Sequence, residues 1–598
     1  MAVSLSKSDF MLGKQCPFKL KYKKAGFPSN RDGDPFAAFF AKGGFMVEAL
    51  AHAVLSEDPR VEFERTISHG RFHARVDAYV DRGDAIVLTE IKSASVEGDD
   101  VKQFFHKDDL GILKDHRKYL EDLTFQVMVA RLAFPGRWVI GRLCAVDKTK
   151  SSSIESIFDK IHLIRDASDD KSAPRAVYRG DVEALRRDHF LAFIDADEAI
   201  ELLMPEVTSK SHELLEFLDG NLPDMVPQLD VGLCKRCEYR GPDLIPSGFE
   251  ACWGTTGEES LSIDLYRAGN DKALVSVISD KWSDGKRSIS DVPESILEGG
   301  KSYGPPRRNQ VRSALVNREI VESALAEVLE SLRYPLHFVD FETSSIPVPF
   351  HPNLRPYEKI GFQFSVHTLG EPGATHLKHS EWLNLRDAYP NLQFLNELRG
   401  CVGDSGSIVT WSTFERSTVR NFGLQLQRRG ELDADLSDWI TRLIGEKGDS
   451  SSESRIVDFA DLSRQYYSHP SMNGSHSIKK VLDALWGEAD HLWNHPWFAE
   501  FVIRDESGTP IDPYQSLVSR NTTGILINGH SNDDDEDDTN VNQGVAAMEA
   551  YQALLFGERR DDADYADRLR QALLNYCRLD TLAMVMVWMH WRHRLGLV

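Results

Sequence analysis

The sequence of 598 residues contains no apolar stretch of 18 or more residues, so no segment has the length expected of a membrane-spanning helix. Its first 16 residues lack the apolar core of a secretory signal peptide, and a cytoplasmic location is therefore expected. Cysteines are few, and their odd number, seven, argues against a disulfide framework.

Basic residues are outnumbered: 70 lysines and arginines stand against 93 aspartates and glutamates, for a net charge of −23. This balance argues against a protein that coats nucleic-acid phosphates with its whole surface. It is compatible with an enzyme that concentrates carboxylates at metal sites. Hydrophobic residues make up 41% and charged residues 27%, which is typical of a globular protein. The length predicts two to four domains.

Sequence patterns divide the chain into three zones, at about residues 1–255, 256–332 and 333–598. In the first zone, the pattern predicts strands at Arg75–Val80 and Ala85–Lys92. Asp81–Asp84 has the composition of a hairpin turn between them. A long helix is predicted at Asp115–Ala133.

The middle zone is interpreted as a connector with some structure of its own, ending in a helix at Arg318–Leu332. The third zone alternates strands and helices, which is typical of an α/β layer fold. The strands are predicted at Leu336–Phe341, Phe362–Leu369, Ser407–Trp411 and Arg455–Phe459, and the helices at Thr413–Arg429, Ser477–Trp486 and from Asp564 onward.

The first chemical pattern lies on the predicted hairpin. Glu90 and Lys92 are two residues apart on one strand and therefore share a face, which Asp77 on the neighbouring strand can also reach. Two carboxylates can hold a divalent cation, and a lysine can stabilise charge on a phosphate or on an attacking water. Glu48, on an earlier helix, is a further candidate metal ligand. Gln126, on the following helix, is placed to contact the site or a DNA backbone.

His52, one helical turn after Glu48, is the competing ligand, and we interpret it as a helix histidine with its hydrogen bonds satisfied. The set Glu48, Asp77, Glu90-x-Lys92 and Gln126 resembles the RecB-type PD-(D/E)XK nucleases. These include the nuclease domain of the AddB helicase–nuclease subunit and the CRISPR-associated iron–sulfur exonucleases. The resemblance implies a restriction-endonuclease-like fold. Relatives often carry histidine in place of Glu48.

Four cysteines bracket this pattern: Cys16 precedes it, and Cys234, Cys237 and Cys252 follow it. Four thiolates can hold a zinc ion or an iron–sulfur cluster, although a CxxC pair also fits a redox motif. The resemblance favours a [4Fe–4S] cluster, with zinc as the alternative. The other cysteines lie in apolar surroundings and are interpreted as buried thiols; they are Cys144, Cys401 and Cys577.

The second chemical pattern begins at Asp340 and Glu342, which share one strand face. Tyr576 and Asp580, four residues apart, share one face of the last helix. Glu415 lies where a strand leads into a helix and is the preferred fourth carboxylate. Its rival, Asp458, is interpreted as the cap of the helix that follows its own strand.

This second set resembles the DEDD exonucleases of the RNase H-like superfamily, in the subgroup with tyrosine in the third motif. The family's middle motif normally ends in aspartate, where this chain has Glu415. The resemblance implies two divalent metals, Mg²⁺ or Mn²⁺, held by the carboxylates Asp340, Glu342, Glu415 and Asp580. It also implies that Tyr576 orients the attacking water.

Segments 332–343, 355–367 and 474–480 resemble an uncharacterised prokaryotic family, the domain-of-unknown-function 2779 family, which joins a RecB-type domain to a DEDD core. Lys479 and Lys480, in the last of these segments, are candidates for contact with a nucleic-acid backbone.

Together the patterns predict a multidomain α/β metal-dependent nuclease, with DNA favoured as substrate. Its expected role is end processing or degradation in repair, recombination or defence against foreign DNA. Two alternatives stay open: an enzyme whose amino-terminal domain serves as a DNA-binding clamp, and a non-catalytic subunit of a larger complex.

Overall fold

The computed structural model describes residues 3–31, 35–107, 111–164, 175–222, 225–241, 243–255, 260–297, 303–445, 454–520, 545–557 and 559–597. The chain forms two compact units, and neither is continuous in sequence. The first unit comprises Met1–Gln228, Cys237–Thr256 and Ser345–Glu358; the second comprises Leu229–Arg236, Gly257–Ser344 and Lys359–Val598. Within the described residues, no helix is both long and apolar enough to cross a bilayer.

The first unit is built on a six-stranded mixed sheet with the order β1-β3-β4-β5-β8, in which β2 also pairs with β3. The pairs β2–β3, β3–β4 and β5–β8 are antiparallel, and β4–β5 is parallel. The strands are β1 (Leu5–Ser6), β2 (Val61–His69), β3 (Phe72–Asp81), β4 (Ala85–Val96), β5 (Trp138–Asp147) and β8 (Leu191–Asp195), with a separate hairpin of β6 (Ile161–Ile164) and β7 (Arg175–Tyr178).

The predicted hairpin and the long helix of this unit are confirmed. The turn between β3 and β4 depends on Gly83, whose positive φ of 86° is a conformation that glycine adopts without strain. β4 packs against both α3 and α4, so its residues Ile86–Ile91 form a continuous buried run instead of alternating. The helices are α1 (Lys7–Gln15), α2 (Pro17–Lys24), α3 (Pro35–Leu55), α4 (Lys114–Ala133), α5 (Val182–Arg187), α6 (Asp197–Leu218) and α8 (Gly248–Trp253).

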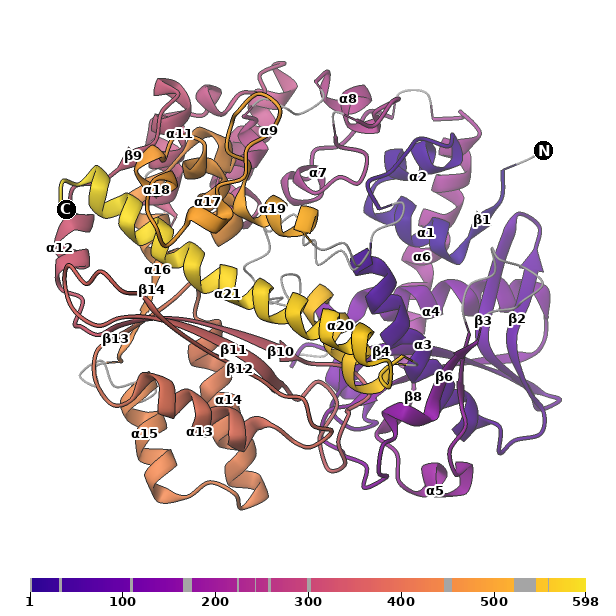
Figure 1. Ribbon diagram of the computed structural model, residues 1–598. Coiled ribbons are helices and arrows are strands. Elements are labelled where there is room, and N and C mark those ends of the chain that lie inside the picture. Colours follow the sequence, from indigo (N-terminus) through magenta and orange to yellow (C-terminus); the bar gives the residue numbers. More distant parts are fainter. Residues whose placement is uncertain are drawn as a thin grey trace. The chain divides into compact units, whose positions relative to one another are not determined.

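The second unit contains a five-stranded mixed sheet in the order β12-β11-β10-β13-β14 (Figure 1). β11 runs antiparallel to both of its neighbours, whereas β10, β13 and β14 are parallel. Four of these strands were predicted, and β12 was not. Their bounds are β10 (Leu336–Ser344), β11 (Ile360–Leu369), β12 (Lys378–Leu383), β13 (Ser407–Thr410) and β14 (Ile456–Asp458).

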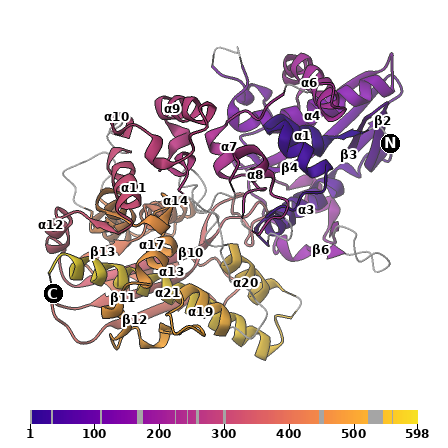
Figure 2. The same ribbon diagram turned by 90° about the horizontal axis from the view of Figure 1, so that it is seen from above.

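Helices cover both faces of this sheet, as Figures 1 and 2 show. Along β10, Val339 and Phe341 pack into the core formed with α13 (Asn391–Val402), α14 (Phe414–Arg429) and α15 (Ala434–Ile444). Phe338, on the opposite face, packs beneath α21 (Ala563–Arg594). The two-residue period of the strand therefore places Asp340 and Glu342 on the face that α21 crosses.

The predicted helix at Arg318–Leu332 is wrong in its first half. Ile320–Val321 form strand β9, which pairs with β15 (Tyr467–Ser468), and only Leu325–Glu330 form a helix, α12. The β-branched residues of β9 have a partner strand that the local sequence does not reveal, and the pairing overrides helix propensity.

The remaining helices of the second unit lie partly in the zone interpreted as a connector. Arg307, fully buried on α11, donates to the carbonyl oxygens of Tyr266 and Arg267 and pairs with Asp271, and so orders this zone. The helices are α7 (Val231–Lys235), α9 (Lys272–Ser283), α10 (Glu294–Leu297), α11 (Gly304–Val316), α16 (Phe459–Tyr466), α17 (Ile478–Trp486), α18 (Asp490–Trp493), α19 (Pro513–Arg520) and α20 (Val545–Phe556).

Candidate metal centres

Three carboxylates of the second unit meet where α21 crosses β10. Asp340, Glu342 and Asp580 each offer an oxygen atom, and these atoms lie within 4.8 Å of one another. Glu342 and Asp580 are buried, and Asp340 is partly buried. An uncompensated cluster of buried carboxylates is unfavourable, and a hard divalent cation with oxygen ligands would compensate it. The sequence prediction paired these residues from motifs 240 positions apart, and the structure brings them together.

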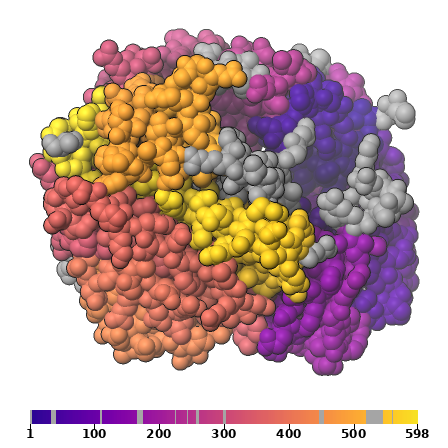
Figure 3. Space-filling model, viewed as in Figure 1, coloured from indigo at the N-terminus to yellow at the C-terminus, as the bar shows by residue number. Residues whose placement is uncertain are grey.

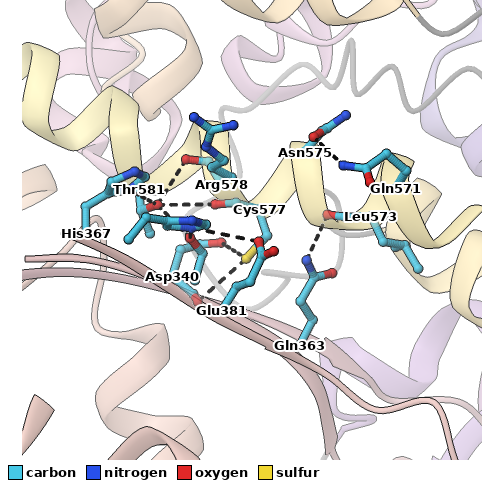
Figure 4. A network of polar contacts seen from close by, with 12 residues as sticks. Asp340, Gln363, His367, Glu381, Gln571, Leu573, Asn575, Cys577, Arg578 and Thr581 are labelled. Carbon is cyan, nitrogen blue, oxygen red and sulfur yellow. Dashed lines mark hydrogen bonds and ion pairs between the residues drawn. The ribbon is translucent and has the colours of Figure 1, made fainter. Parts of the chain in front are cut away.

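A polar network holds α21 against the sheet (Figure 4). The same helix carries Asp580. Thr581 bonds through its hydroxyl to His367 Nδ1 at 2.7 Å and to the Ser365 hydroxyl at 2.8 Å. Gln363 donates to the carbonyl oxygen of Leu573 at 2.8 Å. One helical turn later, the sulfur of Cys577 lies 3.4 Å from Asp340 Oδ2. Positions 573, 577 and 581 recur every four residues, so they fix both the rotation and the register of the helix.

The electrostatics of the centre favour cation binding. Burial, followed by repulsion from Asp580 and Glu342, raises the pKa of Asp340 well above its usual range. Burial and repulsion from Asp580 do the same to the pKa of Glu342, and Lys479 opposes this effect. Burial and mutual repulsion therefore oppose ionisation of these carboxyl groups, and a bound cation would favour their charged forms.

Glu415 lies in the first turn of α14, is 5% exposed, and has a side-chain oxygen, Oε2, without a hydrogen-bond partner. Burial raises the pKa of Glu415 to about 8. Its charge acts on Asp340 and Glu342, although among described residues it lies outside the group of three within 4.8 Å. The rival Asp458 caps α16 by accepting from the backbone N–H groups of Ala460 and Asp461, which confirms its predicted capping role.

Tyr576, Lys479 and Tyr514 line the same centre. The Lys479 Nζ lies 5.5 Å from the ring centre of Tyr576 and 5.7 Å from that of Tyr514, and it is buried without a hydrogen-bond partner. Tyr514, on α19, donates its phenol O–H to Asp580 Oδ1 at 2.7 Å. Sequence reasoning missed Tyr514, because it belongs to no motif. Lys480 is exposed and is not part of this group.

The stability of the metal-free protein is expected to depend on pH through these carboxyl groups. A carboxyl with a raised pKa binds its proton more tightly in the folded state. Its contribution to the free energy of unfolding therefore falls as pH rises from about 4, the unfolded value, through its folded pKa. For Glu415 that folded pKa is about 8.

The measurement is a series of thermal melts at pH 5 to 8 in EDTA, comparing the wild type with Asp340→Asn. The variant is expected to melt higher at pH 8, on the order of 5 °C, and the difference should shrink at pH 5 or with Mn²⁺ present. If the melting temperatures of the two proteins change in parallel with pH, the expected effect of the raised carboxyl pKa values is contradicted.

In the first unit, Glu90 is fully buried beneath two ammonium groups. Lys92 Nζ lies 2.5 Å and Lys7 Nζ 2.9 Å from its Oε1, and Gln126 donates to its Oε2 at 2.6 Å. Although burial opposes it, Lys92 and Lys7 hold the pKa of Glu90 below its usual range. Asp77 accepts from the Ile91 N–H at 2.7 Å through Oδ2.

Lys92 stays charged in this setting. Although burial works against the charged form, Glu90 and Asp122 hold the pKa of Lys92 above its usual range. Its Nζ lies 2.7 Å from Asp122 Oδ2. Lys92 can therefore act as a fixed cation toward a phosphate and not as a base at neutral pH. Lys7 and Asp122 carry no motif, and sequence reasoning did not find them.

A second acidic group of this unit contains Glu48, His52 and Glu64, whose ligand atoms lie within 4.8 Å of one another. Burial and repulsion from Glu64 raise the pKa of Glu48 to about 7. His52 Nε2 is buried without a hydrogen-bond partner, so the interpretation of His52 as a fully satisfied helix histidine is wrong. Glu64, on β2, adopts a positive φ of 59°, a backbone conformation that residues other than glycine rarely adopt.

None of the seven cysteines, all of which lie among the described residues, forms a disulfide. Burial raises the pKa of Tyr22, and the thiols of Cys252, Cys16 and Cys237 raise it further. The Tyr22 hydroxyl lies 2.9 Å from the sulfur of Cys252. These three cysteines therefore surround one tyrosine of the first unit, whereas Cys234 belongs to the second unit. Cys144 and Cys577 are buried as predicted, and Cys401 is partly buried.

Part of the chain matches a known family model. Residues 337–477, roughly a quarter of the chain, match the model of a family described as a domain of unknown function (DUF2779). The match includes Asp340, Glu342 and Glu415 and ends before Tyr576 and Asp580. No curated protein and no solved structure matches the chain.

Proposed function

We propose that the protein is a metal-dependent nuclease whose principal hydrolytic centre is the carboxylate group of the second unit. The observation that carries this proposal is the convergence of Asp340, Glu342 and Asp580 within 4.8 Å at the crossing of β10 and α21. Three carboxylates on a rigid strand and helix suit hard divalent cations such as Mg²⁺ or Mn²⁺. Such ions, when bound, supply Lewis-acid stabilisation of a phosphate and an activated water.

The side chains around the carboxylates support phosphodiester hydrolysis. Lys479 presents an ammonium group with no hydrogen-bond partner, which can bind a non-bridging phosphate oxygen. Tyr576 lies beside it, 5% exposed, and can orient the attacking water through its phenol. The mixed five-stranded sheet with helices on both faces supports the assignment to the RNase H-like DEDD exonucleases.

The first unit is proposed to have a PD-(D/E)XK-type fold. Its support is the helix–hairpin–helix–strand order of α3, β2 to β4, α4 and β5, and the cluster of Asp77, Glu90 and Lys92 that this order creates. Gln126 contacts Glu90 from α4 and is fully buried, so its contact with nucleic acid stays a prediction.

An iron–sulfur cluster is proposed for the region around Tyr22, with Cys16, Cys237 and Cys252 of the first unit as ligands; the role of Cys234 as the fourth ligand stays a prediction from the sequence. A tetrahedral zinc site with Zn–S bonds of about 2.3 Å needs sulfur atoms about 3.8 Å apart. Among described residues, no three cysteines have sulfur atoms within 4.8 Å of one another. The sequence resemblance favours a [4Fe–4S] cluster, with zinc as the alternative.

The substrate is proposed to be nucleic acid, with DNA favoured, and the role end processing or degradation in repair, recombination or defence. One observation favours a variant of this proposal with a single active centre. Both oxygen atoms of Glu90 are bonded to lysines and a glutamine, so the first unit could serve as a DNA-binding clamp.

Cleavage of end-labelled single- and double-stranded DNA and RNA by the anaerobically purified full chain tests the proposal. Cleavage is expected with Mg²⁺ or Mn²⁺ and is expected to stop with EDTA. Asp340→Ala and Lys92→Ala are then compared. If both units cut, each variant loses a different product class; if the second unit alone cuts, Asp340→Ala loses everything. Absence of cleavage by the wild type on all substrates rejects a self-sufficient nuclease.

A further inference from the structure

Glu90 in the first unit has no oxygen lone pair left for a metal ion. Its Oε1 lies 2.9 Å from Lys7 Nζ and 2.5 Å from Lys92 Nζ. Its Oε2 lies 3.1 Å from Lys7 Nζ and 2.6 Å from Gln126 Nε2. A carboxylate has about four acceptor positions, so this set saturates it. The two ammonium groups also bring two positive charges, which equal the charge of a divalent ion.

Lys7 is the partner of Glu90 that blocks metal binding there. It comes from the first turn of α1 and reaches both oxygen atoms of Glu90, as a bidentate metal ion would. Its ammonium also lies 3.9 Å from Asp122. A metal ion at Glu90 would have to displace Lys7 and leave an ammonium group beside the bound cation, which Coulomb repulsion disfavours.

Glu48, His52 and Glu64 form a neighbouring group with the donor atoms that Glu90 lacks. Glu48 and His52 are one turn apart on α3, with Nε2 of the histidine 3.7 Å from Oε1 of the glutamate. Glu64 reaches the same point from β2. Small rotamer movements bring such atoms to the spacing of about 3 Å found between ligands around an ion with bonds of about 2.1 Å.

His52 is oriented as metal-binding histidines are. Its Nε2 is buried without a hydrogen-bond partner, while a hydrogen bond to the backbone of Asp77 involves the ring. The ring also packs on Phe63, with 3.9 Å between ring centres. The orientation is therefore set before any ligand binds.

Arg75 is the cation that competes for this group, because it forms an ion pair with Glu64. Its side chain is 68% exposed. An exposed ion pair contributes little free energy, so it is a weak competitor for a divalent ion.

We propose that the first unit binds its divalent metal at Glu48, His52 and Glu64, and that Lys7 takes the place of a metal at Glu90. One imidazole and two carboxylates select a transition-metal ion such as Mn²⁺ or Zn²⁺ over Mg²⁺. This inference deepens the proposed function by assigning the metal of one unit. Its test measures metal binding and not cleavage, so the two can fail separately.

The test uses the full chain carrying Asp580→Asn, which disables the centre of the second unit. Mn²⁺ is titrated and followed by electron paramagnetic resonance. We expect a bound Mn²⁺ whose electron spin echo is modulated by a directly bound imidazole nitrogen. His52→Gln is expected to abolish that modulation, and His52→Gln and Glu64→Gln each to weaken Mn²⁺ binding about tenfold or more. Excess Mg²⁺ is expected to displace little Mn²⁺.

Two matched controls complete the experiment. Glu62→Gln changes an exposed glutamate two residues away on the same strand, and Glu90→Gln changes the saturated carboxylate; both are expected to leave the Mn²⁺ site intact. Circular dichroism and thermal melting check that each variant is folded. The proposal is overturned if Glu90→Gln abolishes Mn²⁺ binding while His52→Gln preserves it, if bound Mn²⁺ shows no nitrogen coupling, or if no Mn²⁺ binds.

Discussion

Replacing Asp580 with asparagine is expected to lower the rate of nucleic-acid cleavage by the second unit by about a thousandfold. The substitution preserves the shape of the side chain and an oxygen that can accept from Tyr514, which now donates at 2.7 Å. It removes one of the three negative charges that converge within 4.8 Å. A thousandfold lower rate corresponds to a loss of roughly 4 kcal/mol of the stabilisation that the metal gives to the transition state.

A stability measurement distinguishes this result from misfolding. Because the three carboxylates repel one another without a metal, Asp580→Asn is expected to melt at the same temperature as the wild type in EDTA or higher. Single-turnover cleavage rates at several Mn²⁺ concentrations provide the activity. A variant that retains wild-type rates at all of these concentrations would remove Asp580 from the catalytic centre.

The same assay decides between Glu415 and Asp458 as the fourth carboxylate. Glu415→Gln is expected to reduce the rate strongly, because Glu415 is buried with an unpartnered oxygen and interacts electrostatically with Asp340 and Glu342. Asp458→Asn is the matched control, since asparagine caps a helix about as well as aspartate. The opposite pattern of loss would assign the metal to Asp458.

Cys237→Ser is expected to remove nearly all bound iron and the broad visible absorption of an iron–sulfur cluster. The first unit should also lose several kcal/mol of stability, because the free energy of metal binding is part of its folding free energy. Iron content, the visible spectrum and thermal melting of anaerobically purified protein provide the measurements. Cys16→Ser and Cys252→Ser are expected to behave alike.

Cys144→Ala is the control, because Cys144 is a buried thiol in β5, paired in register with Ile91. It should leave the iron content unchanged. Zinc without colour in the wild type would assign a tetrahedral zinc site, and the absence of both metals would mean independent thiols around Tyr22.

The elements that the sequence predicted well are those whose pattern is local. β3, β4, α4 and the strands β10, β11, β13 and β14 have periods and turn residues that fall within a few positions of one another. β9 was predicted as helix because its partner strand, β15, is distant in the chain. β12 was not predicted because it is an edge strand whose mostly polar sequence, KHSEWL, shows no apolar alternation.

The sequence by itself determined the chemistry of the site through residues in fixed short patterns. Asp340 with Glu342, Tyr576 with Asp580, and Glu90 with Lys92 each share a face, because strand and helix periods dictate which neighbours lie together. The tertiary structure alone decided which other groups surround them. Lys7 beside Glu90, Tyr514 beside Asp580, and Glu64 beside Glu48 are packing neighbours without a motif. A side chain's partner across the fold depends on how distant elements pack, and that information is not contained in any short window of sequence.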